Sequence, residues 1–239
     1  MAVSQESIVD TGLRLLDDHG LAGVSLRRIA RELGVQAPTL YWHVANKRQL
    51  LDLMAERLIT RVRPDGGGPR DGEPWWDWLS QHTHETFGLM TAHRDSHLVI
   101  AGNRPTPASL PQIESALEVL VNVGFAPSEA QQLLFALGAY VGGSVLEWHA
   151  EADRQRSGVD DTDLLQELLK PGGYPTLRAA FTDLQGQPHG ATFAYGLDLI
   201  LTGARVRHAA RVGAPPEVVL RIVEDLHRRV GLAQSPDRV

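Results

Sequence analysis

The chain has 239 residues, 43% of them hydrophobic, which is enough to bury a substantial core in one or two domains. It contains no cysteine, which excludes a disulfide framework and a thiolate metal site and fits a reducing cytoplasm. The net charge of −6 argues against a protein that coats nucleic acid with its whole surface. The sequence has no signal-peptide pattern and no run of about 18 apolar residues, so we expect a cytoplasmic protein without a membrane span.

The first sixty residues predict four short helices, and no stretch of the chain has the pattern of a β-strand. Ser4 or Ser7 can cap a first helix, which Gly20 would end. Ser25 can cap a second helix, which carries a compact apolar stripe and stops before Gly34. We therefore expect an all-α protein.

Two further helices follow in this first part of the chain. Pro38 suits the first turn of a third helix, although its cap would then be Ala37, which is a poor capping residue. Asn46 and Gln49 have the spacing of a capping box and predict a fourth helix over residues 46–63. This fourth helix would link the first part of the chain to the rest.

A segment rich in Gly and Pro, PDGGGPRDGEP at residues 64–74, is the best candidate for a domain boundary. We expect one domain over residues 1–63 and a second over residues 64–239. The second should hold longer helices and a polar loop at residues 153–175. In chain order we expect one helix that begins near Pro74, another that ends at Gly124, and a long helix that opens with a capping box of Ser128 and Gln131. A helix over residues 191–209 and an additional helix near 215–230 follow.

The second and third helices, joined by LGVQAP, have the pattern of a helix-turn-helix motif. In that motif the second helix lies in the major groove of DNA, and its first residues reach the base edges. Leu40 and Val44, four residues apart, can supply the buried face of this helix. Tyr41, Trp42 and His43 would then point mostly outward, toward the DNA duplex.

The charge distribution fits DNA binding through this one end of the molecule. Residues 1–65 hold nine basic and eight acidic residues, and the acidic excess falls in the remainder. Within residues 24–48 the only acid is Glu32, against five basic residues: Arg27, Arg28, Arg31, Lys47 and Arg48. A locally basic head on an acidic body is typical of a protein that binds DNA with the head alone.

Several stretches resemble the tetracycline-repressor (TetR) family of transcriptional regulators. They are LGVQAPTLYWHVANKRQLLD, SHLVIAGNRPT, LEWHAE and FAYGLDLILTG, and the resemblance spans about residues 4–205. It implies a three-helix helix-turn-helix head and a helical ligand-binding and dimerisation domain. It also implies a homodimer held by an intersubunit four-helix bundle, here from residues 128–150 and 191–209, where Gly138, Gly142, Gly143, Gly196 and Gly203 would allow close approach.

The resemblance assigns the contacts to a double-stranded DNA operator. Arg27 and residues 37–43 would contact bases and sugars, while Thr39, Tyr41 and Lys47 would bind phosphates. The full set is Arg27, Ala37, Pro38, Thr39, Tyr41, Trp42, His43 and Lys47. Arginine can bind guanine in bidentate fashion, whereas phosphate contacts position the protein without reading sequence. Ala37 stands where the tetracycline-binding members have a glutamine that can read adenine, so we expect a different operator.

The ligand should differ as well. Ile100 stands where the tetracycline-binding members have a histidine that binds the drug's magnesium ion, and isoleucine cannot ligate a metal. Glu147, in LEWHAE, keeps the acid that holds the metal's water in those proteins. Other drug-contacting positions are replaced by Arg63, His82, Thr86 and Ala116. We therefore expect an inducer other than magnesium-tetracycline.

The remaining residues of the predicted pocket favour a largely apolar, ring-containing small molecule. Its apolar walls would be Ile100, Ile113, Leu117, Leu134, Leu137 and Val141, and its polar groups would be His82, Asn103, Arg104 and Arg63. The same apolar residues could instead form a solid core. No cofactor is expected.

Three alternatives stay open from the sequence. A regulator of the same fold could sense a metal or a protein partner, because His93 and His97 are spaced to place two imidazoles on one helix face, with HTHE at 82–85 nearby. It could also activate transcription rather than repress it. The helix near 215–230 could pack on its own subunit, cover the pocket or add a dimer contact. An enzyme is not expected, because no catalytic triad order, phosphate loop or HExxH motif occurs.

Overall fold

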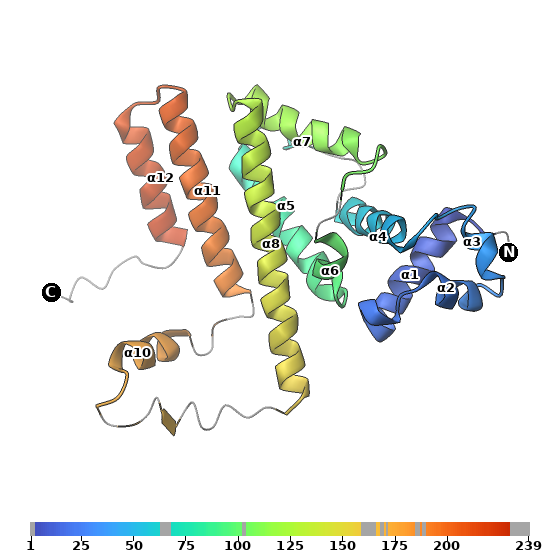
Figure 1. The fold of residues 1–239 in the computed structure, drawn as a ribbon. Coiled ribbons are helices and arrows are strands. Elements are labelled where there is room, and N and C mark those ends of the chain that lie inside the picture. Colours follow the sequence, from blue (N-terminus) through green and yellow to red (C-terminus); the bar gives the residue numbers. More distant parts are fainter. Residues whose placement is uncertain are drawn as a thin grey trace.

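A computed structural model of the chain describes residues 3–62, 68–101, 104–158, 166–167, 170, 172–184, 187 and 190–229, with the side chains of 61 and 62 left aside. All regular secondary structure in these ranges is helical, which confirms the all-α prediction (Figure 1). In the same ranges, no helix combines the length and the apolar character that a membrane crossing needs.

The first part of the chain, which we call the head, consists of four α-helices and one 3₁₀ turn. They are α1 (Gln5–His19), η1 (Leu21–Gly23), α2 (Leu26–Glu32), α3 (Ala37–Leu40) and α4 (Lys47–Val62). Ser4 and Ser7 form a capping box at the start of α1, and Gly20 ends the helix with a φ of 68°. The carboxamide of Asn46 accepts the Gln49 N–H at 3.0 Å and caps α4.

In the rest of the chain, which we call the body, seven α-helices can be given bounds within the described residues. They are α5 (Trp75–Ala92), α6 (Ser96–Ile100), α7 (Leu110–Asn122), α8 (Pro127–Arg156), α10 (Pro175–Leu184), α11 (Ala191–Arg211) and α12 (Pro216–Arg229). The long helix α8 runs through the body beside α11, and α12 packs on the other side of α11 (Figure 1). The head lies at the opposite end of the molecule from α12.

The structure corrects two predicted helix starts. Helix α3 begins at Ala37 itself, and its N-cap is Gln36 rather than Ala37, with no capping hydrogen bond from the side chain. Helix α8 begins at Pro127, before the expected Ser128–Gln131 capping box. Its first turn is held by the carboxylate of Glu129, which accepts the Ala126 N–H at 3.2 Å. An acid in the first turn of a helix also interacts favourably with the helix dipole.

Two further expectations about the body were incomplete. The predicted loop at 153–175 starts too early, because α8 continues to Arg156, and much of the remaining segment lies outside the described residues. The short helices α6 and α10 were not anticipated, because five and ten residues give too little periodicity to identify a helix.

Two hydrophobic cores hold the molecule together. The head core is formed by α1 to α4 around fully buried residues such as Leu16, Ile29 and Leu58. It also contains Val99, which belongs to α6 of the body and is 1% exposed. The body core joins α5, α8 and α11, and the partly buried side chain of Ile100 packs against both cores. Helix α6 is therefore packed into the head as well as into the body.

Candidate functional site

Helix α3 and the turn after it present two large aromatic side chains to solvent. Leu40 and Val44 are fully buried in the head core, and the backbone N–H of Val44 donates to the Leu40 carbonyl at 2.8 Å. This anchoring leaves Trp42 89% exposed and Tyr41 56% exposed. His43 is half-buried, and its carbonyl accepts a hydrogen bond from the Gln5 side chain at 3.3 Å. The segment is fixed by its buried residues, but the Trp42 side chain itself is not packed into the head core. A large aromatic side chain exposed in this way is typical of a binding surface.

The other residues predicted to contact DNA lie on the surface of the head. Pro38 and Thr39 are exposed at the start of α3, while Ala37 is half-buried against the head core. Arg27 is exposed on α2, and Lys47 is exposed in the first turn of α4.

Only part of the positive charge on the head is neutralised. Arg14 pairs with Glu32 at 2.8 Å, and Arg48 pairs with Asp52 at 2.8 Å. Within the part of the chain that the structure describes, neither Arg27 nor Lys47 enters an ion pair. Their charges are therefore available to a phosphate backbone or to the acceptor edge of a base.

The head is tied to the body by hydrogen bonds at the start of α6. Asp95 adopts the left-handed conformation, with a φ of 52°, and its carboxylate accepts the backbone N–H of Leu21 at 2.8 Å. Two residues earlier, the imidazole of His93 lies 3.0 Å from the carboxylate of Asp17 on α1. These contacts were not anticipated, because no local pattern indicates a pairing across more than seventy residues.

A second connection joins the segment after α6 to α4. The hydroxyl of Thr106 donates to the carboxylate of Glu56 at 2.5 Å. At the next position of α4, the guanidinium of Arg57 contacts Glu6 at 2.9 Å and Asp10 at 3.3 Å, both on α1. Helix α4 is thus bound both to α1 and to the segment that follows α6.

Some of the residues predicted to line a ligand pocket lie together in the body. Leu137 and Val141 of α8 are buried in the body core, and Ile100, Ala116, Leu117 and Leu134 pack against it while partly exposed. Ile113 is also partly buried, on the same helix as Ala116 and Leu117. These apolar side chains from α6, α7 and α8 therefore gather at one core surface.

The polar members of the predicted pocket are more dispersed. His82 and Thr86 are partly buried on α5, where the His82 ring stacks on Trp78 and the Thr86 hydroxyl donates to the His82 carbonyl at 2.8 Å. Arg104 and Glu147 are exposed. Arg63 and Asn103 lie outside the described residues.

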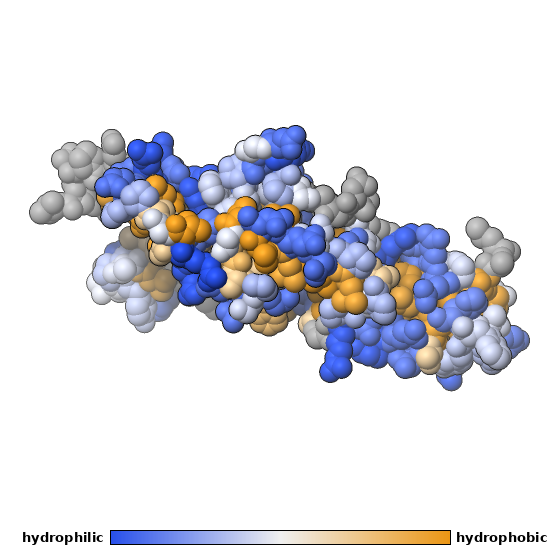
Figure 2. Space-filling view, turned by 90° about the horizontal axis from the view of Figure 1, so that it is seen from above, coloured by the Kyte–Doolittle hydropathy of each residue, from blue (hydrophilic) through white to orange (hydrophobic). Residues whose placement is uncertain are grey.

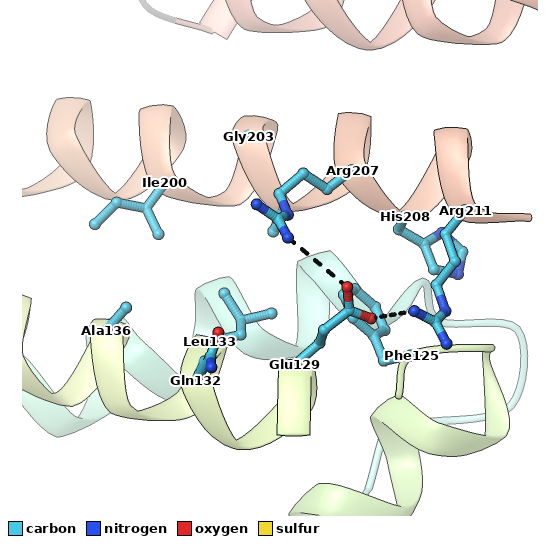
Figure 3. Close-up of a pocket in the computed structure, with 11 residues that line it drawn as sticks. Phe125, Glu129, Gln132, Leu133, Ala136, Ile200, Gly203, Arg207, His208 and Arg211 are labelled. Atoms are coloured by element: carbon cyan, nitrogen blue, oxygen red, sulfur yellow. Dashed lines mark hydrogen bonds and ion pairs between the residues drawn. The ribbon is translucent and has the colours of Figure 1, made fainter. Parts of the chain in front are cut away.

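Two clefts open elsewhere in the body, and neither is lined by the predicted ligand-binding residues. The first, of about 390 Å³, lies between α8 and α11, and in it Glu129 contacts Arg211 at 2.6 Å and Arg207 at 3.7 Å (Figure 3). The second, of about 380 Å³, lies between the start of α5, the end of α11 and α12.

The paired histidines do not form the helical metal site considered above. His93 ends α5 in an extended conformation, whereas His97 lies on α6 and stacks on His149 of α8. The two imidazoles therefore do not share one helix face. In the described ranges, no cluster of three or more His, Asp or Glu side chains could hold a metal ion.

Helices α8 and α11 expose large apolar side chains to solvent. Phe135 is 74% exposed, and Leu146, Tyr195 and Leu199 are each between 45% and 48% exposed. Figure 2 shows that hydrophobic residues interrupt the hydrophilic surface at several places along the molecule. Single exposed apolar residues are ordinary, but a group of them on two adjacent helices indicates a protein–protein contact.

The glycines of these two helices differ in what surrounds them. Among the described residues, and apart from chain neighbours and the nearby backbone of the same helix, a Cβ at Gly138, Gly142, Gly143 or Gly203 would meet no atom within 4 Å. At Gly196 a Cβ would lie 2.2 Å from the hydroxyl of Tyr140, which donates to the Phe193 carbonyl at 2.9 Å. Gly196 is therefore explained by packing within the subunit, while the other four leave α8 and α11 open to a neighbour.

Comparison with known proteins places this geometry in one family. The model of the tetR family of bacterial regulatory proteins matches residues 8–54, and that of the tetracyclin repressor-like C-terminal domain matches residues 68–208. Tetracycline repressor protein class C of Escherichia coli is 33% identical over 202 residues, which are 84% of this chain and 90% of that protein. That relative is a repressor protein.

Solved structures agree with this assignment. A substituted form of TetR from Acinetobacter baumannii AYE in complex with minocycline is 30% identical, with a TM-score of 0.66 over 84% of this chain and 92% of that one. ActR from Streptomyces coelicolor in complex with actinorhodin is 28% identical, with a TM-score of 0.69 over 85% of this chain and 96% of that one. The chain therefore belongs to the tetR family of bacterial regulatory proteins and is a DNA-binding transcriptional regulator.

Proposed function

We propose that the protein is a homodimeric repressor that binds a palindromic operator and is released by a small, largely apolar, ring-containing molecule other than magnesium-tetracycline. Residues 1–63 form its DNA-binding domain, and residues 64–239 form its ligand-binding and dimerisation domain. The observation that carries the proposal is the exposure of Trp42 and Tyr41 on a segment anchored by Leu40 and Val44. Such side chains gain contacts when the head lies in the DNA major groove.

Homodimerisation is supported by the apolar face of α8 and α11. Covering Phe135, Leu146, Tyr195 and Leu199 would remove apolar surface from water, and each Å² buried contributes about 25 cal/mol. A two-fold dimer would place the two heads on successive turns of DNA, about 34–36 Å apart. An operator for two such heads is a palindrome.

Release by a small molecule is supported by the position of α6. Ile100 packs against both cores, Val99 is buried in the head core, and Asp95 binds the backbone of Leu21. A ligand that displaces α6 therefore changes the position of the head. The free energy that couples ligand binding to DNA binding is typically about 1–3 kcal/mol.

The identity of the ligand class rests on the chemistry of the predicted pocket. An isoleucine at position 100 gives a metal no donor, so a magnesium complex has no anchor there. Relatives bind minocycline and actinorhodin, which supports a small-molecule inducer for this chain as well.

The first test is a fluorescence-anisotropy titration with DNA that flanks the gene of this protein, followed by a compound library. We expect tight binding to a palindrome, and release by an apolar ring-containing compound but not by tetracycline with magnesium. Trp42→Ala should weaken binding at least about tenfold, whereas Leu220→Ala, at an exposed position on α12, should not. Undiminished binding by the Trp42 variant would exclude the assigned surface, and release by magnesium-tetracycline would exclude the assigned ligand class.

A further inference from the structure

The cleft between α5, α11 and α12 has the features of a ligand-binding site. Its volume of about 380 Å³ is in the range of small-molecule pockets. Helix α12, which forms one wall, lies beyond residues 68–208, where the repressor-like domain model matches. The cleft also contains none of the residues predicted to hold the inducer, so it is a separate place in the molecule.

Two N–H donors in the lining of this cleft are buried and have no acceptor. They are the indole Nε1 of Trp75 and the guanidinium Nε of Arg205, and these residues are 4% and 8% exposed. Neither nitrogen finds a hydrogen-bond partner in the part of the chain that the structure describes. Buried polar groups are usually paired, because an unpaired donor loses its hydration without replacement. Both nitrogens could donate a hydrogen bond to an acceptor oxygen supplied by a ligand.

The charges at the cleft also favour an anion. Arg205 lies 3.2 Å from Asp225, but Asp225 is shared with Arg228, so the acid is not dedicated to Arg205. The lining contains a second cation, Arg221, which is exposed. The lining of this cleft therefore holds two guanidinium groups, those of Arg205 and Arg221, and one carboxylate, that of Asp225. A second carboxylate, supplied by a ligand, would bring the charges into balance.

The remaining lining is aromatic and aliphatic. The guanidinium of Arg205 lies 4.5 Å from the centre of the Trp76 ring, and Trp75 packs edge-to-face against Trp76. On the opposite wall, α12 contributes Val218 and Ile222. A flat ring fits between an indole and a branched aliphatic wall, and the indoles exclude water from an acid bound beside them.

We propose that this cleft binds a small aromatic carboxylate, with its ring between the tryptophans and α12 and its acid group on Arg205 and Arg221. The site is independent of the inducer pocket proposed above. It explains what α12 adds to the domain, because Val218, Arg221 and Asp225 all come from this helix.

The test uses the full-length protein and isothermal titration calorimetry. The probe is 1-naphthoate, and the matched neutral probe is 1-naphthalenemethanol. We expect saturable binding of the acid below about 1 mM, and affinity for the alcohol weaker by at least about tenfold. Arg221→Gln, at an exposed position, should reduce this difference between the two probes.

Two variants locate the binding site. Val218→Trp places a large side chain in the mouth of the cleft and should weaken 1-naphthoate binding at least about tenfold. Leu220→Trp, at a position 62% exposed and outside the lining, should leave it unchanged. The proposal is overturned by no binding below about 1 mM, by equal affinity for both probes, or by binding that survives Val218→Trp.

Discussion

Asp95 provides the strongest test of how the head is attached to the body. Its carboxylate accepts the Leu21 N–H at 2.8 Å from a left-handed backbone conformation. The approach is possible because Gly20 has no side chain, since a Cβ there would lie 2.6 Å from Oδ2 of Asp95. Two substitutions of Asp95, by alanine and by glycine, can therefore distinguish the loss of the hydrogen bond from the energetic cost of the left-handed backbone conformation.

The magnitude follows from these two effects. A hydrogen bond to a charged acceptor contributes about 1.5–3 kcal/mol, and the left-handed conformation costs alanine about 1 kcal/mol more than it costs aspartate or glycine. Asp95→Ala should therefore lower the free energy of unfolding by about 3 kcal/mol. Asp95→Gly loses the hydrogen bond but tolerates the backbone, so it should lose about 1 kcal/mol less than the alanine variant.

Urea unfolding followed by circular dichroism measures these differences, and Asp18→Ala is the matched control. Asp18 is an exposed acid of α1 whose ion pair with Arg14 is 3.7 Å long, so its loss should change stability by less than about 0.5 kcal/mol. The reasoning fails if Asp95→Ala costs no more than the control. If the glycine and alanine variants are equally unstable, the left-handed conformation of Asp95 is not imposed by the fold.

Three further predictions concern acid stability, packing and DNA affinity. Burial, with a neighbouring imidazole, holds the pKa of His97 below its usual 6.5, so the folded state binds this proton less readily than the unfolded state. The free energy of unfolding should therefore fall as the pH drops through about 6.5. Urea titrations at pH 7.5 and 5.5, each about one unit from that value, should show a smaller fall for His97→Gln than for the unsubstituted protein. Gly196→Ala should destabilise the subunit by about 1–3 kcal/mol by displacing the Tyr140 hydroxyl. Gly203→Ala should leave the stability of the subunit unchanged and weaken self-association in sedimentation experiments. A larger loss of stability for Gly203→Ala than for Gly196→Ala would contradict the packing argument. Lys47→Ala should weaken binding to all DNA sequences alike and lower the salt slope by about 1, and a change of sequence preference would contradict its assignment to phosphate.

The head could be predicted from the sequence because its signals are local. Ser4, Gly20, Ser25 and Asn46 each act within four residues of the helix end that they define, so the spacing of residues is sufficient to read them. The start of α3 was misplaced by one residue, because neither Gln36 nor Ala37 supplies a capping side chain. That start is fixed instead by the burial of Leu40 and Val44, which is a tertiary effect.

The body was less accessible to sequence reasoning because its decisive contacts are long-range. Nothing local indicates that Asp95 binds Leu21 or that Thr106 binds Glu56. The amphipathic pattern of α12 predicted a helix, but not that its packing against Trp75 and Arg205 would leave a cleft with unpaired donors. Periodicity identifies which face of a helix is buried, and it does not say how completely the buried faces fill the space between them.

The contacts of α6 also bear on the proposed response to a ligand, because position 100 is an isoleucine, whose side chain cannot bind a metal ion. Ile100 packs on both hydrophobic cores, and the neighbouring Val99 is buried among head residues. In the release mechanism proposed above, a ligand that occupies space beside Ile100 displaces α6, because packed cores respond to displacement by shifting whole elements rather than by deforming. Asp95 and Thr106, which bind η1 and α4 through two hydrogen bonds, would carry that displacement to the head. In that proposal the response needs no metal ligand at position 100, so we expect the pocket to select its ligand by shape.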